Sequence, residues 1–332
     1  DARVLVIEAG GTDQENPVLN PGLWPTNIRS ERDWGHAAAP SPKVNNRSLI
    51  LPMGTVVGGG SSVNASVWAR GHKNDFDLWA AETGDPGWSY ARVLEIYKRI
   101  EDWQGAPDPV RRGKGGRLWV APAQNPNPIA QAMLAAAASM GIPKFDDQNG
   151  VMMEGAGGAA IANLRIRDGR RRNLPADYLY QALKRPDMTL LTGAEVQTLK
   201  MEGKRVKGVT FVRDGKVQTV RAARRVVLCA GAINTPKILM LSGIGDDAEL
   251  KRHGIKVAVK LPGVGRNFQD HVLVASCIWE YNNPLPPANN AAEATFFWKS
   301  DASLPTPDLQ PFQIEVPYAS EVTGPQFKPP AG

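Results

Sequence analysis

The chain has 332 residues, 42% of them hydrophobic and 22% charged, and its 39 basic and 33 acidic side chains give a formal net charge of +6. This length predicts roughly two domains, each large enough to bury its own core. The composition excludes collagen-like chains, flexible linkers and membrane-spanning chains, and two cysteines are too few for a disulfide framework or a Cys-based zinc site.

The first predicted element is a β-strand over residues 4–7. Its sequence, Val4-Leu5-Val6-Ile7, is an unalternating apolar run, which is typical of a parallel strand buried on both faces. Glu8 follows directly. In a dinucleotide-binding βαβ unit, such an acidic residue accepts hydrogen bonds from a ribose, and a Gly-rich phosphate loop lies about 20 residues upstream. That loop would fall before residue 1, so we expect either that the motif is absent or that the chain lacks an N-terminal part.

A glycine-rich segment follows a proline-interrupted, irregular stretch over residues 12–50. It contains Gly58-Gly59-Gly60, which expose backbone N–H groups that an approaching phosphate or ring system could use. The alternative is a flexible surface turn. The valines on both sides of the glycines disfavour that alternative, because flexible linkers carry few of them.

Two helices are predicted in the middle of the chain. The first runs from Ser89 as N-cap to about Asp102, with apolar residues at helical spacing. The second begins with Pro128, ends near Met140 and is closed by Gly141.

A cluster of five arginines lies between Arg165 and Arg172, around the turn signal Asp168-Gly169. Nucleic-acid sites interleave such residues with aromatic side chains, and none is closer than Tyr178. We therefore expect a solvated or anion-facing loop rather than a nucleic-acid site.

Short strands follow after residue 189. Residues 196–199, 206–212, 217–220 and 225–228 are predicted to form an antiparallel meander with turns at Glu202-Gly203 and Asp214-Gly215. A helix with Thr235 as cap and Pro236 as its first residue should then run to Gly243, and a further short helix should end at Gly254. The junction before the first of these helices is a natural seat for a pyrophosphate.

The two cysteines, Cys229 and Cys277, both end apolar runs. We expect them to be buried free thiols, which favours a reducing compartment.

Four segments in chain order resemble one family, the glucose–methanol–choline (GMC) flavin oxidoreductases. They are residues 4–11, the first signature at 54–71 with its continuations at 75–80 and 87–90, the second signature at 231–245, and the element at 261–271. Within the family the chain is most similar to bacterial choline-dehydrogenase-like and alcohol-dehydrogenase-like members. It looks like a fragment that lacks both ends.

The resemblance implies a mixed α/β fold, with a Rossmann-type FAD-binding domain interleaved with a substrate domain on an antiparallel sheet. The FAD-binding domain would comprise residues 1–120, incomplete at the N-terminus, and 189–271. The substrate domain would comprise 121–188 and 272–332, incomplete at the C-terminus.

The same resemblance implies which residues contact FAD. Glu8 should hold the adenosine ribose, Val196 should meet the adenine edge through its backbone, and Ala230 and Gly231 should approach the nucleotide. The flavin and pyrophosphate should lie against the loop of Val56, Gly58, Gly59 and Gly60, and the isoalloxazine ring against Asn64, Ala65, Ser66 and Val67.

Two departures from the family refine these expectations. Some members attach FAD through a His directly before the Asn of the first signature, whereas this chain has Val63 there, which predicts non-covalent FAD. The family's catalytic base is a His in a C-terminal segment. None of His36, His72, His253 and His271 matches that position, so no catalytic residue is assigned and the base is expected beyond residue 332.

The leading hypothesis is therefore an FAD-dependent oxidoreductase that oxidises a primary alcohol or polyol to an aldehyde by hydride transfer to flavin N5. The alternatives are a flavin-containing lyase of the same scaffold, such as a hydroxynitrile lyase, and a catalytically inert fragment. The electron acceptor stays open between oxygen and a quinone or other carrier. We expect no nucleic-acid partner, no metal, no transmembrane segment and a cytoplasmic location.

Overall fold

The computed structural model describes residues 2–274, 277–279, 282–283, 285–319 and 324, which form two compact units. Unit 1 comprises Asp1–Asp13, Ile28–Gly60 and Ala182–Leu273. Unit 2 comprises Gln14–Asn27, Ser61–Gln181 and Val274–Gly332. Each unit is thus assembled from three separate segments of the chain, and the domain boundaries expected from the sequence stay a prediction.

Unit 1 contains the predicted first strand, β1 (Val4–Ile7), which pairs in parallel with β10 (Met188–Leu191). The parallel arrangement agrees with the sequence-based expectation. Burial on both faces does not, because Val4 is 42% and Leu5 39% exposed. Within the described residues β1 has a single strand neighbour, so the first half of the strand lacks a covering layer.

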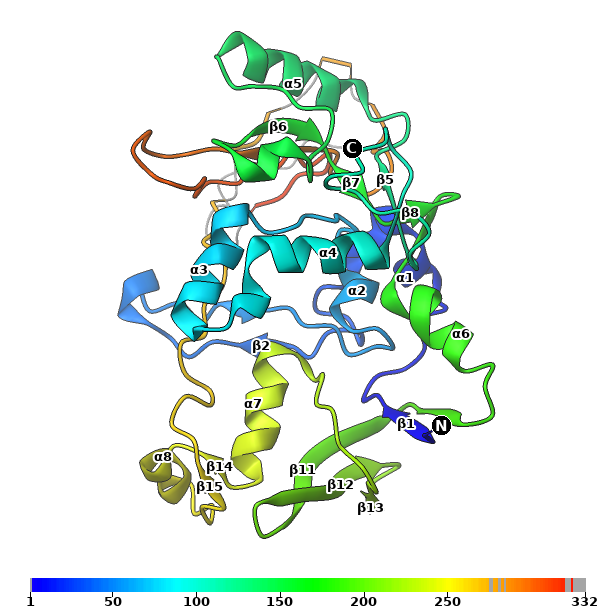
Figure 1. Cartoon of the computed structure of the whole chain (residues 1–332), viewed down its shortest axis with the longest axis vertical. Coiled ribbons are helices and arrows are strands. Elements are labelled where there is room, and N and C mark those ends of the chain that lie inside the picture. Colours follow the sequence, from blue (N-terminus) through cyan, green and yellow to red (C-terminus); the bar gives the residue numbers. More distant parts are fainter. Residues whose placement is uncertain (1, 275–276, 280–281, 284, 320–323, 325–332) are drawn as a thin grey trace. The chain divides into compact units, whose positions relative to one another are not determined.

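The predicted meander forms a three-stranded antiparallel sheet of β11 (Ala194–Glu202), β12 (Arg205–Arg213) and β13 (Lys216–Arg221). Figure 1 shows these strands side by side with α7 (Gly231–Leu241) running alongside them. Apolar side chains of the sheet and α7 form one core cluster, which contains Ala194, Leu199, Val209, Phe211 and Ile238. The helix α7 therefore covers the apolar face of this sheet as a second layer.

The start of α7 differs from the sequence-based prediction. The helix begins at Gly231, with Ala230 as its N-cap, and Pro236 lies inside it rather than at its first position. A proline in the second turn removes one backbone hydrogen bond, and four residues before the Thr235-Pro236 signal nevertheless adopt helical geometry. The helix does end before Gly243, whose φ is +80°.

The prediction of a fourth strand at residues 225–228 is wrong, because these residues are irregular in the structure. Val227 is 71% exposed, and Cys229 and Cys277 are both exposed free thiols. The prediction of buried cysteines is therefore also wrong. An apolar run becomes a buried strand only when neighbouring strands cover it, and this run pairs with none in the described part of the chain.

The remaining elements of unit 1 are short. The strands β2 (His36–Ala37) and β3 (Ile50–Leu51) pair antiparallel, and β14 (Ile244–Gly245) and β15 (Val259–Lys260) pair in parallel. The helix α8 (Asp247–Arg252) ends before Gly254, as predicted.

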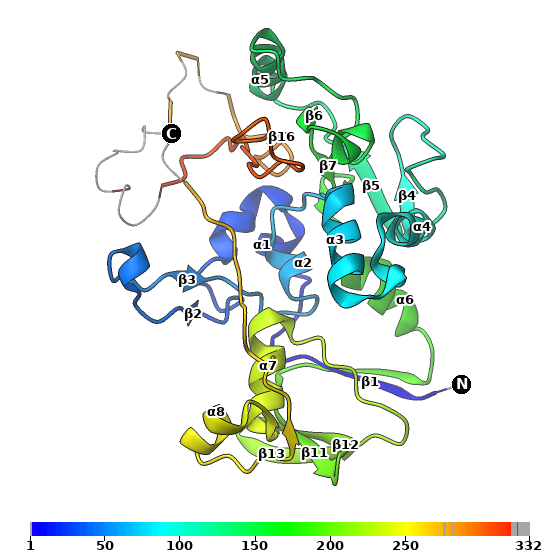
Figure 2. The ribbon, with the colours of Figure 1, turned by 60° about the vertical axis from the view of Figure 1, so that its left-hand side comes forward.

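Unit 2 contains both helices predicted in the middle of the chain. They are α4 (Tyr90–Ile100), with Ser89 at its N-cap, and α5 (Pro128–Ser139), capped by the Asn127 side chain. Figure 2 shows α5 next to β6 (Gly158–Ile161) and β16 (Ala294–Phe297), which pair antiparallel. Leu134 of the helix and Phe296 of the strand belong to the core cluster between them.

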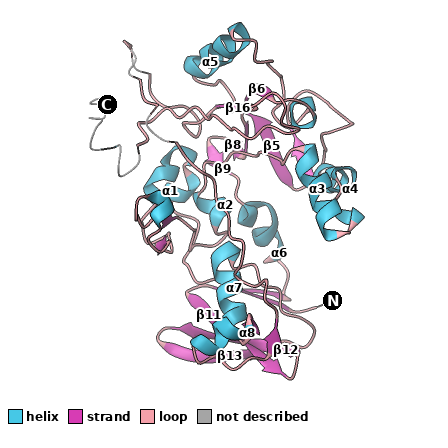
Figure 3. Ribbon diagram, turned by 90° about the vertical axis from the view of Figure 1, so that its left-hand side faces the viewer, coloured by secondary structure: helices cyan, strands magenta, loops and turns pink. Residues whose placement is uncertain are grey.

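The other elements of unit 2 are mostly short and joined by long loops (Figure 3). The helices are α1 (Asn16–Leu19), α3 (Lys73–Thr83) and α6 (Tyr180–Ala182), and α2 (Gly60–Val63) follows the glycine-rich segment. The strands are β4 (Glu101–Trp103), β5 (Leu118–Pro122), β7 (Asn163–Leu164), β8 (Ile166–Arg167) and β9 (Arg170–Arg171).

Within the described ranges, none of the helices combines the length and the apolar character needed to cross a membrane.

Candidate functional site

Glu8 lies at the carboxyl end of β1, as predicted. Its Oε1 accepts a hydrogen bond of 2.8 Å from the Gly10 N–H, and its backbone carbonyl accepts one of 2.9 Å from the Ala194 N–H at the start of β11. Burial raises the pKa of the Glu8 carboxyl, and hydrogen bonds from the backbone N–H groups of Gly10 and Ala9 act in the opposite direction. The parallel strand thus presents a fixed carboxylate beside a glycine turn.

The glycine-rich segment is held directly against this turn. Gly11 and Val56 form a parallel β-bridge, and the Val57 N–H donates to the Gly11 carbonyl at 3.0 Å. A Cβ on Gly10 would lie 1.9 Å from the Thr55 carbonyl oxygen, so the two backbones touch where only glycine fits. The structure therefore brings Glu8 and Val56 together within unit 1.

The segment itself is a tight turn rather than a flexible one. Val56 is fully buried, and its carbonyl accepts a 2.7 Å hydrogen bond from the Gly59 N–H. Gly58 and Gly59 have φ values of +92° and +51°, in the region that favours glycine, and Gly60 is exposed. These glycines leave backbone groups unshielded by side chains.

Two further predicted contacts lie in the same unit. Val196 is half-buried in β11, two residues after Ala194, whose N–H bonds to the Glu8 carbonyl. Ala230 and Gly231 are exposed at the first turn of α7. The first N–H groups of a helix have no partner inside it and carry partial positive charge, which suits a phosphate.

Asn64, Ala65, Ser66 and Val67 belong to unit 2, and other parts of that unit hold them tightly. The carbonyls of residues 64, 65 and 66 accept hydrogen bonds from the Arg171 side chain, the Asn290 side chain and the Arg165 N–H. Ser66 is 2% exposed and has a φ of +61°, an unusual value for a residue other than glycine. The segment is thus rigid and locally strained.

The arginine cluster that supplies two of these contacts is only partly the solvated loop expected from the sequence. Arg167 and Arg170 are exposed, but Arg165 and Arg171 are buried. Arg165 forms an ion pair with the buried Asp177, which also pairs with Arg172 at 2.6 Å. The partners lie elsewhere in the fold, so the expectation is wrong for the two buried members.

The four histidines occupy structural or surface positions. His72 is buried as the N-cap of α3, where Nδ1 accepts from the Asn74 N–H at 3.1 Å and Nε2 lies 2.9 Å from the Gly155 carbonyl. His36 stacks on Trp34, His253 lies 3.3 Å from Glu249, and His271 is exposed. The expectation that none of them is the catalytic base stays a prediction.

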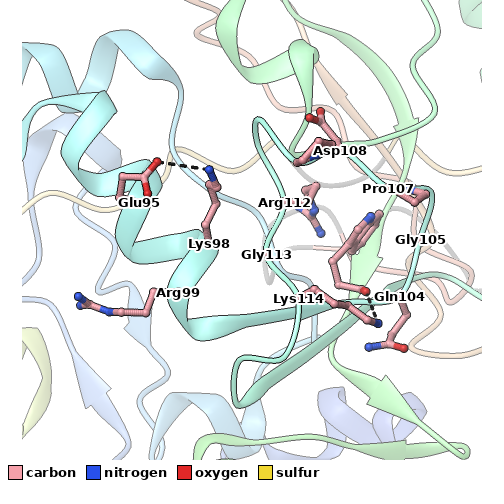
Figure 4. Close-up of a pocket in the computed structure, with 12 residues that line it drawn as sticks. Glu95, Lys98, Arg99, Gln104, Gly105, Pro107, Asp108, Arg112, Gly113 and Lys114 are labelled. Atoms are coloured by element: carbon pink, nitrogen blue, oxygen red, sulfur yellow. Dashed lines mark hydrogen bonds and ion pairs between the residues drawn. The ribbon is translucent and has the colours of Figure 1, made fainter.

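A cavity of about 740 Å³ lies in unit 2, between α4 and the loop that follows β4 (Figure 4). Two of the lysines that line it already have partners: Lys98 pairs with Glu95 at 3.3 Å, and Lys114 donates to the Trp103 carbonyl at 2.8 Å. None of the predicted cofactor-binding residues lines it. We therefore do not place the cofactor there.

Sequence reasoning missed Glu293, a fully buried carboxyl in unit 2. The pKa of its carboxyl is raised to about 7: burial and the neighbouring Glu315 raise it, and hydrogen bonds from the Asn127 N–H and the Asn289 amide act in the opposite direction. An acidic residue within the apolar run Ala291-Ala292-Glu293-Ala294 is the signal that could have revealed it. A carboxyl that titrates near neutral pH is characteristic of functional sites, although buried charge networks produce it too.

No group of three or more His, Cys, Asp or Glu side chains placed to hold a metal ion occurs among the residues that the structure describes.

Comparison with known proteins identifies the family. Residues 5–273 match the family model described as GMC oxidoreductase. The chain belongs to this family. GMC oxidoreductases are FAD flavoproteins with a Rossmann-like FAD-binding fold, which confirms the expected fold class and the cofactor.

Individual GMC relatives support the same assignment. The chain is 37% identical to an oxygen-dependent choline dehydrogenase of Brucella anthropi over 92% of its own length and 59% of that protein. It is 41% identical to the protein of the same name from Brucella ovis over 82% of its own length and 48% of that protein. The chain thus spans about half to three fifths of these curated relatives.

A solved GMC structure is similar over the full chain. The crystal structure of pyridoxine 4-oxidase from Mesorbium loti superimposes with a TM-score of 0.91 and 32% identity, covering 100% of this chain and 64% of the other. A formate oxidase structure, at 23% identity and a TM-score of 0.81, shows the same fold.

The residues of this GMC chain fit a flavin nucleotide. The Glu8 carboxylate and the first turn of α7 at Gly231 lie in one unit and supply an acceptor and helix N-terminal N–H donors. Gly58 and Gly59 lie in the same unit and carry no side chain that would block a phosphate or a ring. Gly10 makes a backbone contact with the Thr55 carbonyl that a Cβ would prevent, which keeps the glycine-rich segment next to the carboxylate. A ribose needs an acceptor of this kind, and a pyrophosphate needs such donors.

Proposed function

We propose that this chain forms the FAD-binding part of an oxidoreductase that oxidises a primary alcohol or polyol to an aldehyde. The junction of Glu8, Gly10 and Thr55 carries the proposal. It combines an acidic residue at the end of a parallel strand with a backbone approach that tolerates no side chain.

In this proposal each predicted residue of unit 1 binds one part of the cofactor. Glu8 accepts hydrogen bonds from the adenosine ribose, and Val196 offers its backbone to the adenine edge. The unshielded backbone of residues 56–60 lies against the pyrophosphate and the flavin. Ala230 and Gly231 approach the nucleotide at the first turn of α7, where free N–H groups favour an anion.

The residues of unit 2 in this proposal are Asn64, Ala65, Ser66 and Val67, which contact the isoalloxazine ring mainly through backbone groups. Their rigid hold on the rest of unit 2 suits that role, since a fixed contact surface orients the ring without reorganisation. Val63 has no nucleophile for a bond to the ring, so FAD is bound non-covalently.

Bound FAD would supply flavin N5 as the acceptor for the hydride of the alcohol carbon. The residues of this chain bind and orient the cofactor, and we assign the base that takes the hydroxyl proton to none of its histidines. His72, the buried histidine, already uses both ring nitrogens within unit 2 and is thus committed to capping α3.

The names of the relatives suggest the class of substrate. Choline and pyridoxine both carry a primary alcohol group, which is consistent with a small-molecule alcohol substrate. The electron acceptor stays open between oxygen and a quinone or another carrier. Two exposed free thiols favour a cytoplasmic location, because thiols persist in a reducing compartment.

The test is to purify the protein, remove free flavin and record the visible spectrum before and after adding a primary alcohol without oxygen. We expect FAD to be released intact by denaturation and the bound flavin to bleach on addition of substrate. A flavin that binds but never bleaches with any alcohol, while a cyanohydrin is cleaved, would support a lyase instead. Failure to bind FAD would overturn the proposal.

A further inference from the structure

Arg171 holds the segment of residues 64–66 from inside unit 2. Its Nη1 lies 2.5 Å from the Asn64 carbonyl, 2.8 Å from the Asn64 Oδ1 and 2.8 Å from the Ser66 Oγ. The Asn64 Oδ1 also accepts from the Ser66 N–H at 3.0 Å. One guanidinium nitrogen therefore fixes both the backbone and the side chains of this segment.

The other end of the guanidinium is anchored as well. Nε donates to the carbonyl of Val18 in α1 at 2.7 Å, so Arg171 ties the segment to this helix. The side chain is buried, and the residue is 3% exposed. A planar guanidinium with donors on both sides can make these contacts together, whereas a lysine ammonium is a single point donor.

The charge of Arg171 is not neutralised by a carboxylate. Of the four buried arginines in the described part of the chain, three form ion pairs: Arg70 and Arg112 with Glu101, and Arg165 with Asp177. Arg171 forms none, and its Nη2 has no hydrogen-bond partner within the described residues. A buried cation without a counter-charge opposes folding, so its presence here requires another reason.

The backbone that it holds is strained. Ser66 has a φ of +61°, which a residue with a Cβ adopts only when its surroundings impose it. The contact between Arg171 and the Ser66 Oγ is one of the constraints that impose it.

We propose that Arg171 is a positioning residue of the flavin site: it fixes residues 64–66 in the conformation that meets the isoalloxazine ring. The inference rests on the proposed function, because it requires that this segment contacts FAD. Loss of Arg171 should therefore change the affinity for FAD and the environment of the ring, and not merely the stability of unit 2.

The test compares four variants of the FAD-loaded protein: Arg171→Met, Arg171→Lys, Ser66→Ala and the control Arg170→Met. Arg170 is the adjacent residue of β9, and it is exposed. For each variant, the apoprotein is titrated with FAD by flavin fluorescence, the visible circular dichroism of the bound flavin is recorded, and kcat and KM are measured for the same alcohol.

We expect Arg171→Met to weaken FAD binding by about tenfold or more, because hydrogen bonds from a charged donor are lost, and to alter the visible dichroism. Arg171→Lys should restore part of the affinity, Ser66→Ala should shift both readouts in the same direction by less, and Arg170→Met should match the wild type. If Arg171→Met does not fold, Arg171→Lys and Ser66→Ala decide the question.

The inference is overturned if the folded Arg171 variants and Ser66→Ala bind FAD with wild-type affinity and an unchanged visible spectrum. That outcome leaves the proposed function intact, because the wild-type protein still binds and reduces FAD. If the wild-type protein itself binds no FAD, the proposed function fails and this inference fails with it.

Discussion

Because Gly10 has no side chain, its backbone can lie directly against the glycine-rich segment. Its backbone contacts the Thr55 carbonyl, so that the Glu8 carboxylate and the glycine-rich segment stay next to each other. The adjacent Gly11 also contacts this segment through its backbone, yet a Cβ at position 11 would meet nothing within 4 Å. Two neighbouring glycines therefore differ in the space around them.

This difference predicts opposite outcomes for the same substitution. Gly10→Ala would drive a methyl group into the Thr55 carbonyl, and we expect a loss of about 1–3 kcal/mol in unfolding free energy together with weaker FAD binding. Gly11→Ala should leave both nearly unchanged. Urea unfolding and fluorescence titration with FAD measure the two effects. Equal effects of the two substitutions would show that the contact with Thr55 is not the constraint.

Arg165 and Arg171 show which contacts the sequence could not reveal. Both lie in a cluster that local composition describes as a solvated loop, and yet both are buried. The acceptors of Arg171 are 107 and 153 residues away along the chain, at Asn64 and Val18. Only the folded arrangement of unit 2 brings them within reach, so no local pattern predicts them.

The pair of strands β4 and β5 depends on a buried network at Glu101. These strands are parallel and joined by a loop without a helix, and Glu101 closes that loop. Its carboxylate accepts from the Arg70 Nη2 at 2.8 Å, from the Trp68 Nε1 at 3.1 Å and from the Gly113 N–H at 3.2 Å. Arg112 lies 3.3 Å away, stacked on Trp103.

Removal of the Glu101 charge should therefore lower the free energy of unfolding. Glu101→Gln leaves Arg70 and Arg112 buried without their shared carboxylate, and we expect a loss of about 3–5 kcal/mol in unfolding free energy, measured by urea unfolding. Glu95→Gln is the matched control, because Glu95 is a largely exposed partner of Lys98 and should cost less than about 1 kcal/mol. Similar losses in both variants would contradict the network.

Among the helices and strands, those with a strong local pattern were predictable from the sequence. The apolar spacing of α4, the Pro–Gly limits of α5 and the turns between β11, β12 and β13 all appear where the sequence places them. The strand at 225–228 and the start of α7 were not predictable. Residues 225–228 form no strand because no neighbouring strand in the described part of the chain pairs with them. The helix α7 starts at Gly231 because helical geometry extends upstream of Pro236.

At the scale of the whole chain, each unit holds its own predicted cofactor-binding residues in place. The family signatures predict these residues, because glycines and short polar residues at fixed spacing are visible in the sequence. The buried carboxyl of Glu293 was not identified. Its raised pKa depends on burial and on Glu315, a residue that reaches it only through the fold.

Glu293 predicts a specific pH dependence of stability. A carboxyl whose folded-state pKa is raised from 4.5 to about 7 stabilises the fold fully below the unfolded pKa, and this contribution is lost as the pH rises through about 7. Glu293→Gln cannot ionise. The melting temperature of the wild type should therefore fall relative to that of Glu293→Gln between about pH 5 and about pH 8. A difference that stays constant over this range would contradict the assignment.

The assembly of each unit from three chain segments also affects how the protein is made. The strand β6 ends at Ile161, but its partner β16 begins only at Ala294, on the far side of a long stretch that belongs to unit 1. During translation β6 leaves the ribosome well before the strand that covers its edge. An uncovered strand edge invites pairing with other chains, so we expect the nascent protein to depend on chaperones until β16 emerges.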